Sequence, residues 1–505
     1  MVVKIYSCGL LGLNGYTVET EADISRGLPR YDVVGLPDAS VKESGDRVRA
    51  AMKNSGYEYP VGRVTVNLAP GELRKEGTVY DLPILVSILC ASSALPVPPE
   101  DNCFMGELSL DGRLRPISGV LPMTMHAKKA GMKALFLPAQ NAAEAALVDG
   151  ITVYPLNNIK ELEEHLNGIA PITPQSRTAY EPETNAALDF ADVVGQENVK
   201  RALTIAAAGF HNALLIGTPG SGKSMMAKRL PSIMPDLTEE EALECTQIYS
   251  VAGLLPRGEA MIRSRPVRSP HHSVSLYGFT GGGSRPRPGE ISLAHNGILF
   301  LDELPEFQRD TLEALRQPLE DGTVTISRVA GSCTYPSRFM LVCAMNPCRC
   351  GYYGHPTKKC TCSEKQVAEY KKRISGPLLD RIDLHVTAAP VSVVDLERRE
   401  RGESSAAIKE RVSAAREIQK ERYKGTGITL NSQLTSEMMS EYCTPDAAGQ
   451  NLLRAAFAKL GLSARGYDRI LKVSRTIADL EGDETITAKH IAEAVQYRLL
   501  DRSGI

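Results

Sequence analysis

The spacing of apolar residues predicts an N-terminal block that combines strands and helices, followed by a linker. Residues 1–168 alternate short apolar runs of strand length with amphipathic stretches of helical spacing. The strand-like runs lie at 63–68 and 134–138, and the helix-like stretches lie at 41–54 and 121–130. This block therefore predicts an α+β domain. Residues 169–188 hold three prolines and show no periodicity, which indicates a linker.

Downstream of the linker the pattern changes twice. From 189 to 390, apolar strands alternate with helices in the order typical of a parallel α/β sheet. From 391 to 505, apolar residues recur at helical spacing, in the groups Leu452, Leu453, Phe457, Leu460 and Ile470, Val473, Ile477, Leu480. The predicted fold class is α/β, with an N-terminal α+β domain, a central parallel-sheet domain and a C-terminal helical domain.

Composition narrows the class of protein. The chain has 505 residues, of which 43% are apolar, enough for several packed cores. Lys and Arg number 58 against 60 acids, so a uniformly basic nucleic-acid coat protein is excluded. The 11 cysteines indicate a reduced, intracellular protein. Because residues 82–97 are interrupted by polar residues and no signal-peptide pattern begins the chain, we expect a cytoplasmic protein without membrane spans.

A phosphate-binding loop is predicted between the apolar strand 213–216 and the helix that follows it. Its glycines allow backbone N–H groups to surround phosphate oxygens at a helix N-terminus. Lys223 is expected to reach the β- and γ-phosphates, and Ser224 to hold Mg²⁺. The predicted nucleotide-binding residues are Gly217, Thr218, Pro219, Gly220, Ser221, Gly222, Lys223 and Ser224.

Two later apolar strands end in polar side chains. The strand 298–301 leads to Asp302 and Glu303, and the strand 339–345 leads to Asn346. Parallel sheets bind ligands at the carboxyl ends of their strands. We therefore expect Asp302 to orient the Mg²⁺ shell, Glu303 to polarise the attacking water and Asn346 to position that water. Taken alone, an Asn at a strand end is more often a turn former.

Two arginines are further candidates for contact with the γ-phosphate. Arg381 stands between Asp380 and Asp383, just after a Gly-Pro break. An exposed arginine there can complete the site of a neighbouring subunit, and the alternative is a local Asp–Arg pair. Arg465 begins a helix of the C-terminal domain and is expected to touch the γ-phosphate from that helical lid.

The ordered set of motifs resembles an AAA+ ATPase of the magnesium-chelatase type. The whole chain resembles the bacterial ComM (YifB) group over nearly all 505 residues. The resemblance implies that Arg381 is a trans-acting finger, Asn346 is sensor one and Arg465 is sensor two. It also implies a homo-oligomeric ring, usually a hexamer, that uses ATP and Mg²⁺.

Residues 30–89 resemble the domain of Lon-type proteases. Proteolysis of that type needs a Ser nucleophile activated by a Lys. Val79 stands at the position that matches the Ser, and Leu121 at the position that matches the Lys. The N-terminal block is therefore predicted to be a catalytically dead Lon-like domain, serving as a structural or DNA-guiding collar. Its basic residues Lys42, Arg47, Arg49 and Lys53 either contact phosphates or form a solvated helix face.

Two segments of the central domain are strongly basic. Residues 257–288 hold six arginines and no lysine against the single acid Glu259. Arg285 and Arg287 follow the three glycines 281–283, and this stretch is suited to a mobile loop in a ring pore; the alternative is a solvated insertion. Residues 349–373 hold seven basic residues against two acids. Both segments favour an anionic polymer, single-stranded or branched DNA, as the partner.

A cluster of cysteines lies inside the second basic segment. Cys348 and Cys350 are followed, after nine residues, by Cys360 and Cys362. Four thiolates can close a tetrahedral zinc site that stabilises a loop. The spacing of each pair is tighter than the usual Cys-x-x-Cys, so four reduced surface cysteines remain the alternative.

These features predict an ATP-hydrolysing ring motor that acts on DNA. By resemblance, its role is branch migration of recombination intermediates during natural transformation. The alternative is a protein-remodelling chaperone, as in the chelatase and MoxR relatives, which use a similar ATPase core. Val79 and Leu121 argue against a Lon-like protease. Stimulation of ATP hydrolysis by DNA discriminates between the first two functions.

Overall fold

The computed structural model describes residues 2–183, 188–256, 258–283, 286–328, 331–390 and 401–498. The chain divides into two compact units. The first unit comprises Met1–Glu181, Glu239–Arg263 and Ser327–Tyr335, and the second comprises Pro182–Thr238, Ser264–Ile326 and Pro336–Ile505. Two segments that follow the phosphate-binding loop in the sequence thus fold with the N-terminal unit. The domain boundaries at 168, 188 and 390 stay predictions, and residues 171–183 have neither helix nor strand.

A mixed sheet forms the framework of the first unit. Within the described residues, its seven strands have the order β3-β4-β2-β1-β5-β8-β9. The strand β2 pairs antiparallel with both β1 and β4, and the other neighbours are parallel. The bounds are β1 Val3–Leu11, β2 Asn14–Ser25, β3 Arg30–Val34, β4 Arg63–Ala69, β5 Asn102–Phe104, β8 Ala134–Pro138 and β9 Thr152–Leu156, with the short pair β6 Glu107–Leu108 and β7 Leu114–Arg115. The strands β4 and β8 coincide with the two predicted strands.

Helices complete the first unit: α1 Ala39–Lys42, α2 Ser44–Asn54, α3 Asp81–Ala91, α4 Val120–Lys129, α5 Ala139–Ala145, α6 Ile159–Leu166 and α9 Glu239–Ala252. The helix predicted over 41–54 is interrupted at Glu43, whereas the one predicted over 121–130 matches α4. Residues 81–90 of α3 are all buried, so the apolar stretch seen in the sequence is a core helix. Among the described helices, none combines the length and the apolar character needed to cross a membrane.

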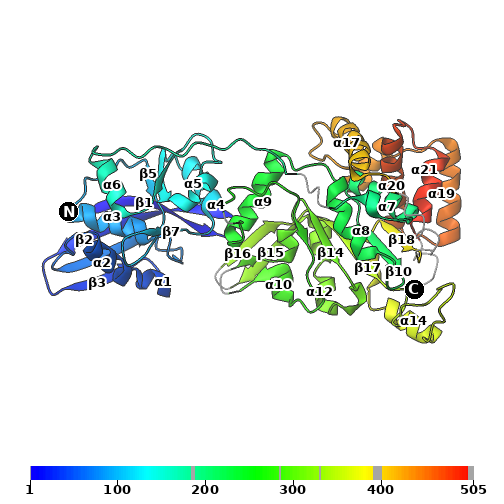
Figure 1. The fold of residues 1–505 in the computed structure, drawn as a ribbon, viewed down its shortest axis with the longest axis horizontal. Helices are drawn as coiled ribbons and strands as arrows, with labels where there is room; N and C mark the ends of the chain where they lie inside the picture. The colour runs from blue at the N-terminus through cyan, green and yellow to red at the C-terminus, as the bar shows by residue number, and fades with distance from the viewer. Residues whose placement is uncertain are drawn as a thin grey trace. The chain divides into compact units, whose positions relative to one another are not determined.

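A parallel sheet forms the framework of the second unit, with the strand order β11-β14-β17-β10-β18 (Figure 1). All its neighbouring strands are parallel. The bounds are β10 Ala213–Gly217, β11 Val267–Arg268, β14 Ile298–Leu301, β17 Met340–Met345 and β18 Leu384–Ala388, and the short strands β12 Gly281–Gly282 and β13 Arg287–Pro288 pair with each other. The pair β15 Thr323–Arg328 and β16 Gly331–Pro336 is divided between the units, because residues 327–335 fold with the first unit. The strands β10, β14 and β17 carry the apolar runs that precede the predicted site residues.

The helices of the second unit pack against this sheet and continue into a helical C-terminal region, drawn in orange and red in Figure 1. Their bounds are η1 Phe190–Asp192, α7 Glu197–Gly209, α8 Lys223–Arg229, η2 Leu230–Ile233, α10 Leu276–Thr280, α11 Glu290–Leu293, η3 Leu304–Glu306, α12 Arg309–Glu313, α13 Arg316–Asp321, α14 Glu364–Lys371, α15 Gly376–Leu379, α17 Ser405–Arg422, η4 Asn431–Gln433, α18 Ser436–Tyr442, α19 Ala447–Leu460, α20 Ala464–Glu481 and α21 Ala488–Gln496.

The α/β fold class, with a parallel-sheet core and a helical C-terminal region, is confirmed. One detail of the apolar pattern differs from the expectation. In α19, Leu453 is buried, whereas Leu452 and Phe457 are 36% and 41% exposed. Fewer of the apolar side chains of α19 are therefore buried in the core than their spacing in the sequence predicts.

Candidate nucleotide-binding site

The phosphate-binding loop joins the end of β10 to the start of α8. Gly220 and Gly222 have φ angles of +80° and +83°, in the left-handed region that favours glycine. Gly217 is required for a different reason, because a Cβ there would lie 2.6 Å from the carbonyl oxygen of Ala388. The glycines found in the sequence therefore serve both the turn of the loop and its close packing against β18.

Lys223 links this loop to the end of β17. Its Nζ donates hydrogen bonds to the carbonyl oxygens of Gly217 at 2.7 Å and Thr218 at 3.1 Å, and to Oδ1 of Asn346 at 3.3 Å. Burial lowers the pKa of Lys223, and the negative charge of Asp302 opposes this shift. Two residues selected separately in the sequence, Lys223 and Asn346, are thus in direct contact.

Ser224 and Asp302 form the second contact between the loop and the sheet. The hydroxyl of Ser224 donates a 2.5 Å hydrogen bond to Oδ2 of Asp302, and Oδ1 of Asp302 accepts one from the backbone N–H of Glu303 at 2.9 Å. A hydroxyl and a carboxylate side by side supply the oxygen ligands that Mg²⁺ takes in nucleotide sites. The residues present therefore fit a Mg²⁺ ion carried by the phosphates.

Glu303 has an unusual backbone conformation. Its φ angle is +52°, although it is not a glycine, and its side chain is 58% exposed. Left-handed non-glycine residues concentrate at functional sites. Oε2 of Glu303 lies 3.6 Å from Nδ1 of His272. The sequence placed His272 in a basic segment, and its position beside the predicted catalytic carboxylate became visible only in the structure.

The two predicted γ-phosphate arginines meet at a carboxylate that the sequence did not single out. Arg381 pairs with Glu320 of α13, and Nη2 of Arg465 lies 3.3 Å from Oε1 of the same Glu320. Arg381 is only 6% exposed, so the expectation of an exposed finger is wrong for this single chain. The partner is not the flanking Asp383, which instead accepts from the backbone N–H of Asn212.

A cavity of about 220 Å³ adjoins the phosphate-binding loop, and no motif pointed to it. The side chain of Gln196 donates to the carbonyl oxygens of Ser221 in the loop, at 3.3 Å, and Ala389, at 2.5 Å. Gly195 and Gln196 both have positive φ angles and form the turn that precedes α7. In the sequence, the glycine at 195 is the local feature that could have indicated this turn. The lining residues are Val194, Gly195, Gln196, Glu197, Asn198, Thr387, Ala389 and Pro390.

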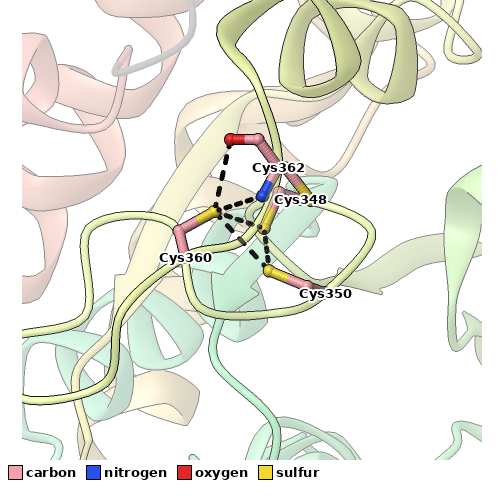
Figure 2. Close-up of side chains that lie close together, drawn as sticks. All are labelled: Cys348, Cys350, Cys360 and Cys362. Atoms are coloured by element: carbon pink, nitrogen blue, oxygen red, sulfur yellow. Dashed lines mark hydrogen bonds between the residues drawn. The ribbon is translucent and has the colours of Figure 1, made fainter.

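The four clustered cysteines converge (Figure 2). Their Sγ atoms all lie within 4.8 Å of one another, and the distances from Cys348 to Cys350 and Cys360 are 3.4 and 3.7 Å. Zinc–sulfur bonds of about 2.3 Å in a tetrahedron place the sulfurs about 3.8 Å apart. Backbone N–H groups of Tyr352 and Thr361 lower the pKa of Cys350 to about 5, which favours its thiolate. Burial and the neighbouring Cys350 and Cys348 raise the pKa of Cys360 to about 12, so the geometry of the four sulfurs carries the case for a metal. The cluster therefore fits a zinc ion.

This cysteine loop, residues 347–362, packs against the phosphate-binding loop. Gly351 has a φ of +86°, and a Cβ there would lie 2.6 Å from Cδ of Pro219. Asn346, which contacts Lys223, lies only two residues before Cys348. The cysteine loop thus approaches the phosphate-binding loop at Pro219 and follows directly after Asn346 in the chain.

The first basic segment is only partly available for an anionic partner. Arg265 is buried and donates to backbone carbonyl oxygens, and Arg268 forms two 2.7 Å hydrogen bonds with the carboxylate of Glu290. Arg287 is exposed on β13. This strand pairs antiparallel with β12, which carries Gly281 and Gly282. Arg285 lies outside the described residues. Phe279 is buried and belongs to the core.

In the first unit, the positions that match a Lon-type catalytic pair are occupied by apolar residues in a packed environment. Leu121 is fully buried, and its backbone N–H donates to Glu144 at 2.8 Å. Of the basic residues on α2, Arg47 forms two hydrogen bonds with the buried Asp81, at 2.7 and 2.8 Å. Arg47 therefore stabilises the unit and is not free to bind phosphates.

Family models match most of the chain. Residues 189–396 match the model described as magnesium chelatase, subunit ChlI, and residues 402–498 match its C-terminal model. Residues 20–141 match a further model described as subunit ChlI of Mg-chelatase. With the phosphate-binding loop on a parallel sheet, these matches define a magnesium-chelatase-type AAA+ protein, a family that uses ATP and Mg²⁺.

Relatives of full length narrow this assignment. The chain is 43% identical to the YifB protein of Escherichia coli over 507 residues, which cover 99% of this chain and 97% of the relative. It is 43% identical to the competence protein ComM of Haemophilus influenzae with the same coverage. The 38 kDa magnesium-chelatase subunit of Rhodobacter capsulatus is 25% identical, over 35% of this chain and 55% of that protein. The chain belongs to the YifB/ComM family.

Proposed function

We propose that this protein is an ATP-driven ring motor in the cytoplasm that moves along DNA, as a branch-migration helicase for recombination intermediates in natural transformation. The observation that carries this proposal is the assembly of Lys223, Ser224, Asp302 and Asn346 at one edge of the parallel sheet. The full-length similarity to a protein named for competence supports the biological role.

The nucleotide site supports ATP hydrolysis through the side chains already in contact. Lys223 holds phosphate oxygens, and its present carbonyl acceptors show that its Nζ reaches into the loop. Ser224 and Asp302 hold Mg²⁺, which when bound neutralises phosphate charge. Glu303 accepts a proton from the attacking water, and Asn346 orients that water. The cavity lined by Gln196 is positioned to receive the nucleobase of ATP, because the side chain of Gln196 also donates a hydrogen bond to Ser221 of the phosphate-binding loop.

In this proposal, hydrolysis requires a homo-oligomeric ring, taken as a hexamer from the family resemblance. Arg381 of one subunit stabilises the charge that develops at the site of its neighbour, and Arg465 closes the helical region over its own site. Arg287, which is exposed on β13, contacts the phosphates of single-stranded or branched DNA. Arg285, which lies outside the described residues, is proposed for the same role from the sequence alone.

The cysteine loop binds zinc as a structural ion. Four protein ligands complete a tetrahedron and leave no open position for catalysis. Gly351 packs on Pro219, so a cysteine loop held rigid by zinc would also hold the phosphate-binding loop in position.

A second candidate is a protein-remodelling AAA+ chaperone. The observation in its favour is that Arg265 and Arg268 are committed to contacts inside the protein, which reduces the positive charge open to DNA. The two functions differ in whether DNA controls ATP turnover.

The deciding experiment measures ATP hydrolysis without DNA and with single strands, duplex or a four-way junction, while junction dissociation is followed in parallel. The motor requires strong stimulation by branched or single-stranded DNA and ATP-dependent dissociation. Lys223→Ala serves as the control without hydrolysis. Turnover that ignores every DNA would reject the motor and favour the chaperone.

A further inference from the structure

Glu320 is shared by two arginines from different parts of the second unit. It lies in α13, whereas Arg381 follows α15 and Arg465 lies in the first turn of α20. Arg381 and Arg465 both approach the same carboxylate oxygen, Oε1. Glu320 therefore ties the helical C-terminal region to the turn that carries Arg381.

The contacts of Arg381 are strong but incomplete. Its Nη1 donates to the carbonyl oxygen of Pro377 at 2.7 Å, and its Nη2 faces Glu320. Among the described residues, its Nε is buried without a hydrogen-bond partner. A buried unpaired donor carries a desolvation penalty, so a ligand with more acceptor oxygens than one carboxylate would bind this guanidinium better.

The environment of Glu320 allows such an exchange. Its side chain is 49% exposed and that of Arg465 is 57% exposed, so one edge of the cluster faces solvent. Within this group of three side chains, one carboxylate is shared by two guanidinium groups. A phosphate group carries more charge than a carboxylate and has three acceptor oxygens.

We propose that Glu320 is a positioning residue that holds Arg381 and Arg465 in a resting arrangement and releases Arg381 to the terminal phosphate of a nucleotide on a neighbouring subunit. This inference rests on the proposed function, in which Arg381 acts in trans. Because Arg465 shares the same carboxylate oxygen of Glu320, its release accompanies that of Arg381. The contact between neighbouring subunits of the ring is thereby coupled to movement of the helical C-terminal region through one side chain.

The test compares Glu320→Gln with Asp321→Asn, which removes one negative charge from the adjacent exposed position. ATP turnover is measured without DNA over a range of protein concentrations. Glu320→Gln removes the anion that competes for Arg381, so we expect turnover to rise about two- to tenfold and to reach half its maximum at lower protein concentration. Asp321→Asn is expected to behave as the wild type. Glu320→Asp, with its shorter reach, should show a smaller change in the same direction.

The activation must act through Arg381. Adding Arg381→Ala to Glu320→Gln should abolish the gain, so that the double variant matches Arg381→Ala alone. Unchanged or lower turnover in both Glu320 variants, with thermal midpoints like that of the wild type, would overturn the proposal, as would a gain that persists without Arg381. Failure of the proposed function is recognised separately, because Arg381→Ala alone would then hydrolyse ATP at the wild-type rate.

Discussion

The hydroxyl of Ser224 donates a 2.5 Å hydrogen bond to the carboxylate of Asp302. The two residues are 78 positions apart in the sequence, and the parallel pairing of β10 and β14 with β17 brings their strand ends to one edge. This contact joins the helix that follows the phosphate-binding loop to the strand that leads into Glu303. The proposed Mg²⁺ ligands are therefore preassembled by the sheet.

Glu303→Gln is predicted to separate nucleotide binding from hydrolysis. Gln keeps the size of the side chain but cannot accept the proton of the attacking water, so turnover should fall by about 10²- to 10⁴-fold. ATP affinity, measured with a fluorescent analogue, should stay close to that of the wild type. Glu306→Gln is the matched control, since that carboxylate faces Arg373. Near-normal turnover in Glu303→Gln would exclude its role as the base.

Two glycines of the cysteine loop provide a matched test of its contact with the nucleotide site. Gly351 and Gly354 both have positive φ angles, so replacement by Ala costs about 1 kcal/mol in backbone strain at either position. Only at Gly351 does the new Cβ meet Pro219, whereas Gly354 faces open space. We expect Gly351→Ala to weaken ATP binding severalfold and Gly354→Ala to leave it unchanged. Equal affinities would show that the cysteine loop does not control the phosphate-binding loop.

Removal of one cysteine should release the proposed zinc. The purified wild type is expected to contain about one zinc per chain by elemental analysis, and cobalt replacement should give thiolate charge-transfer bands. Cys360→Ser should lower the affinity for zinc at least 10- to 100-fold, because loss of a residue that only hydrogen-bonds to a ligand already has an effect of about that size. It should also lower the thermal midpoint of unfolding. Cys90→Ala, a buried cysteine of the first unit, is the control. A wild type without zinc would leave the four cysteines as reduced thiols.

Acid should destabilise the second unit through His385. Burial, reinforced by the positive charges of Arg498 and Arg469, lowers the pKa of His385 to about 3. Between about pH 7.5 and pH 5 the unfolded chain gains a proton on this imidazole while the folded chain does not, so the free energy of unfolding falls by about 2 kcal/mol. Urea unfolding at the two pH values checks this, with His385→Leu expected to lose less stability. The same pH dependence in both proteins would contradict the assignment.

Mixed rings should reveal whether Arg381 acts across subunits. Arg381→Ala is expected to lose about 10³-fold or more of turnover, since an arginine finger contributes about that much. Lys223→Ala is expected to be inactive because its own site lacks the ammonium group that holds the phosphates. When the two are mixed, an intact nucleotide site can meet an intact Arg381, and hydrolysis should reappear. Mixing either one with the Arg381→Ala, Lys223→Ala double variant is the control. If the mixture stays inactive, the trans assignment loses its support.

Much of the candidate site could be predicted because its signals are local. The glycines of 217–222 encode a turn, apolar runs encode buried strands, and polar residues directly after those strands reach the carboxyl edge of a parallel sheet. Lys223, Ser224, Asp302 and Asn346 follow these rules, and the structure brings them into contact. The strands β4 and β8 and the helix α4 were predictable for the same reason.

What the sequence by itself determined is the fold class and the order of residues along the nucleotide site, since backbone preference and apolar periodicity act over a few neighbouring residues. The tertiary structure alone decided that Arg381 and Arg465 share Glu320, that His272 stands beside Glu303, and that residues 239–263 fold with the N-terminal unit. Such contacts depend on which surfaces pack together across long separations in the chain, and no periodicity records that choice.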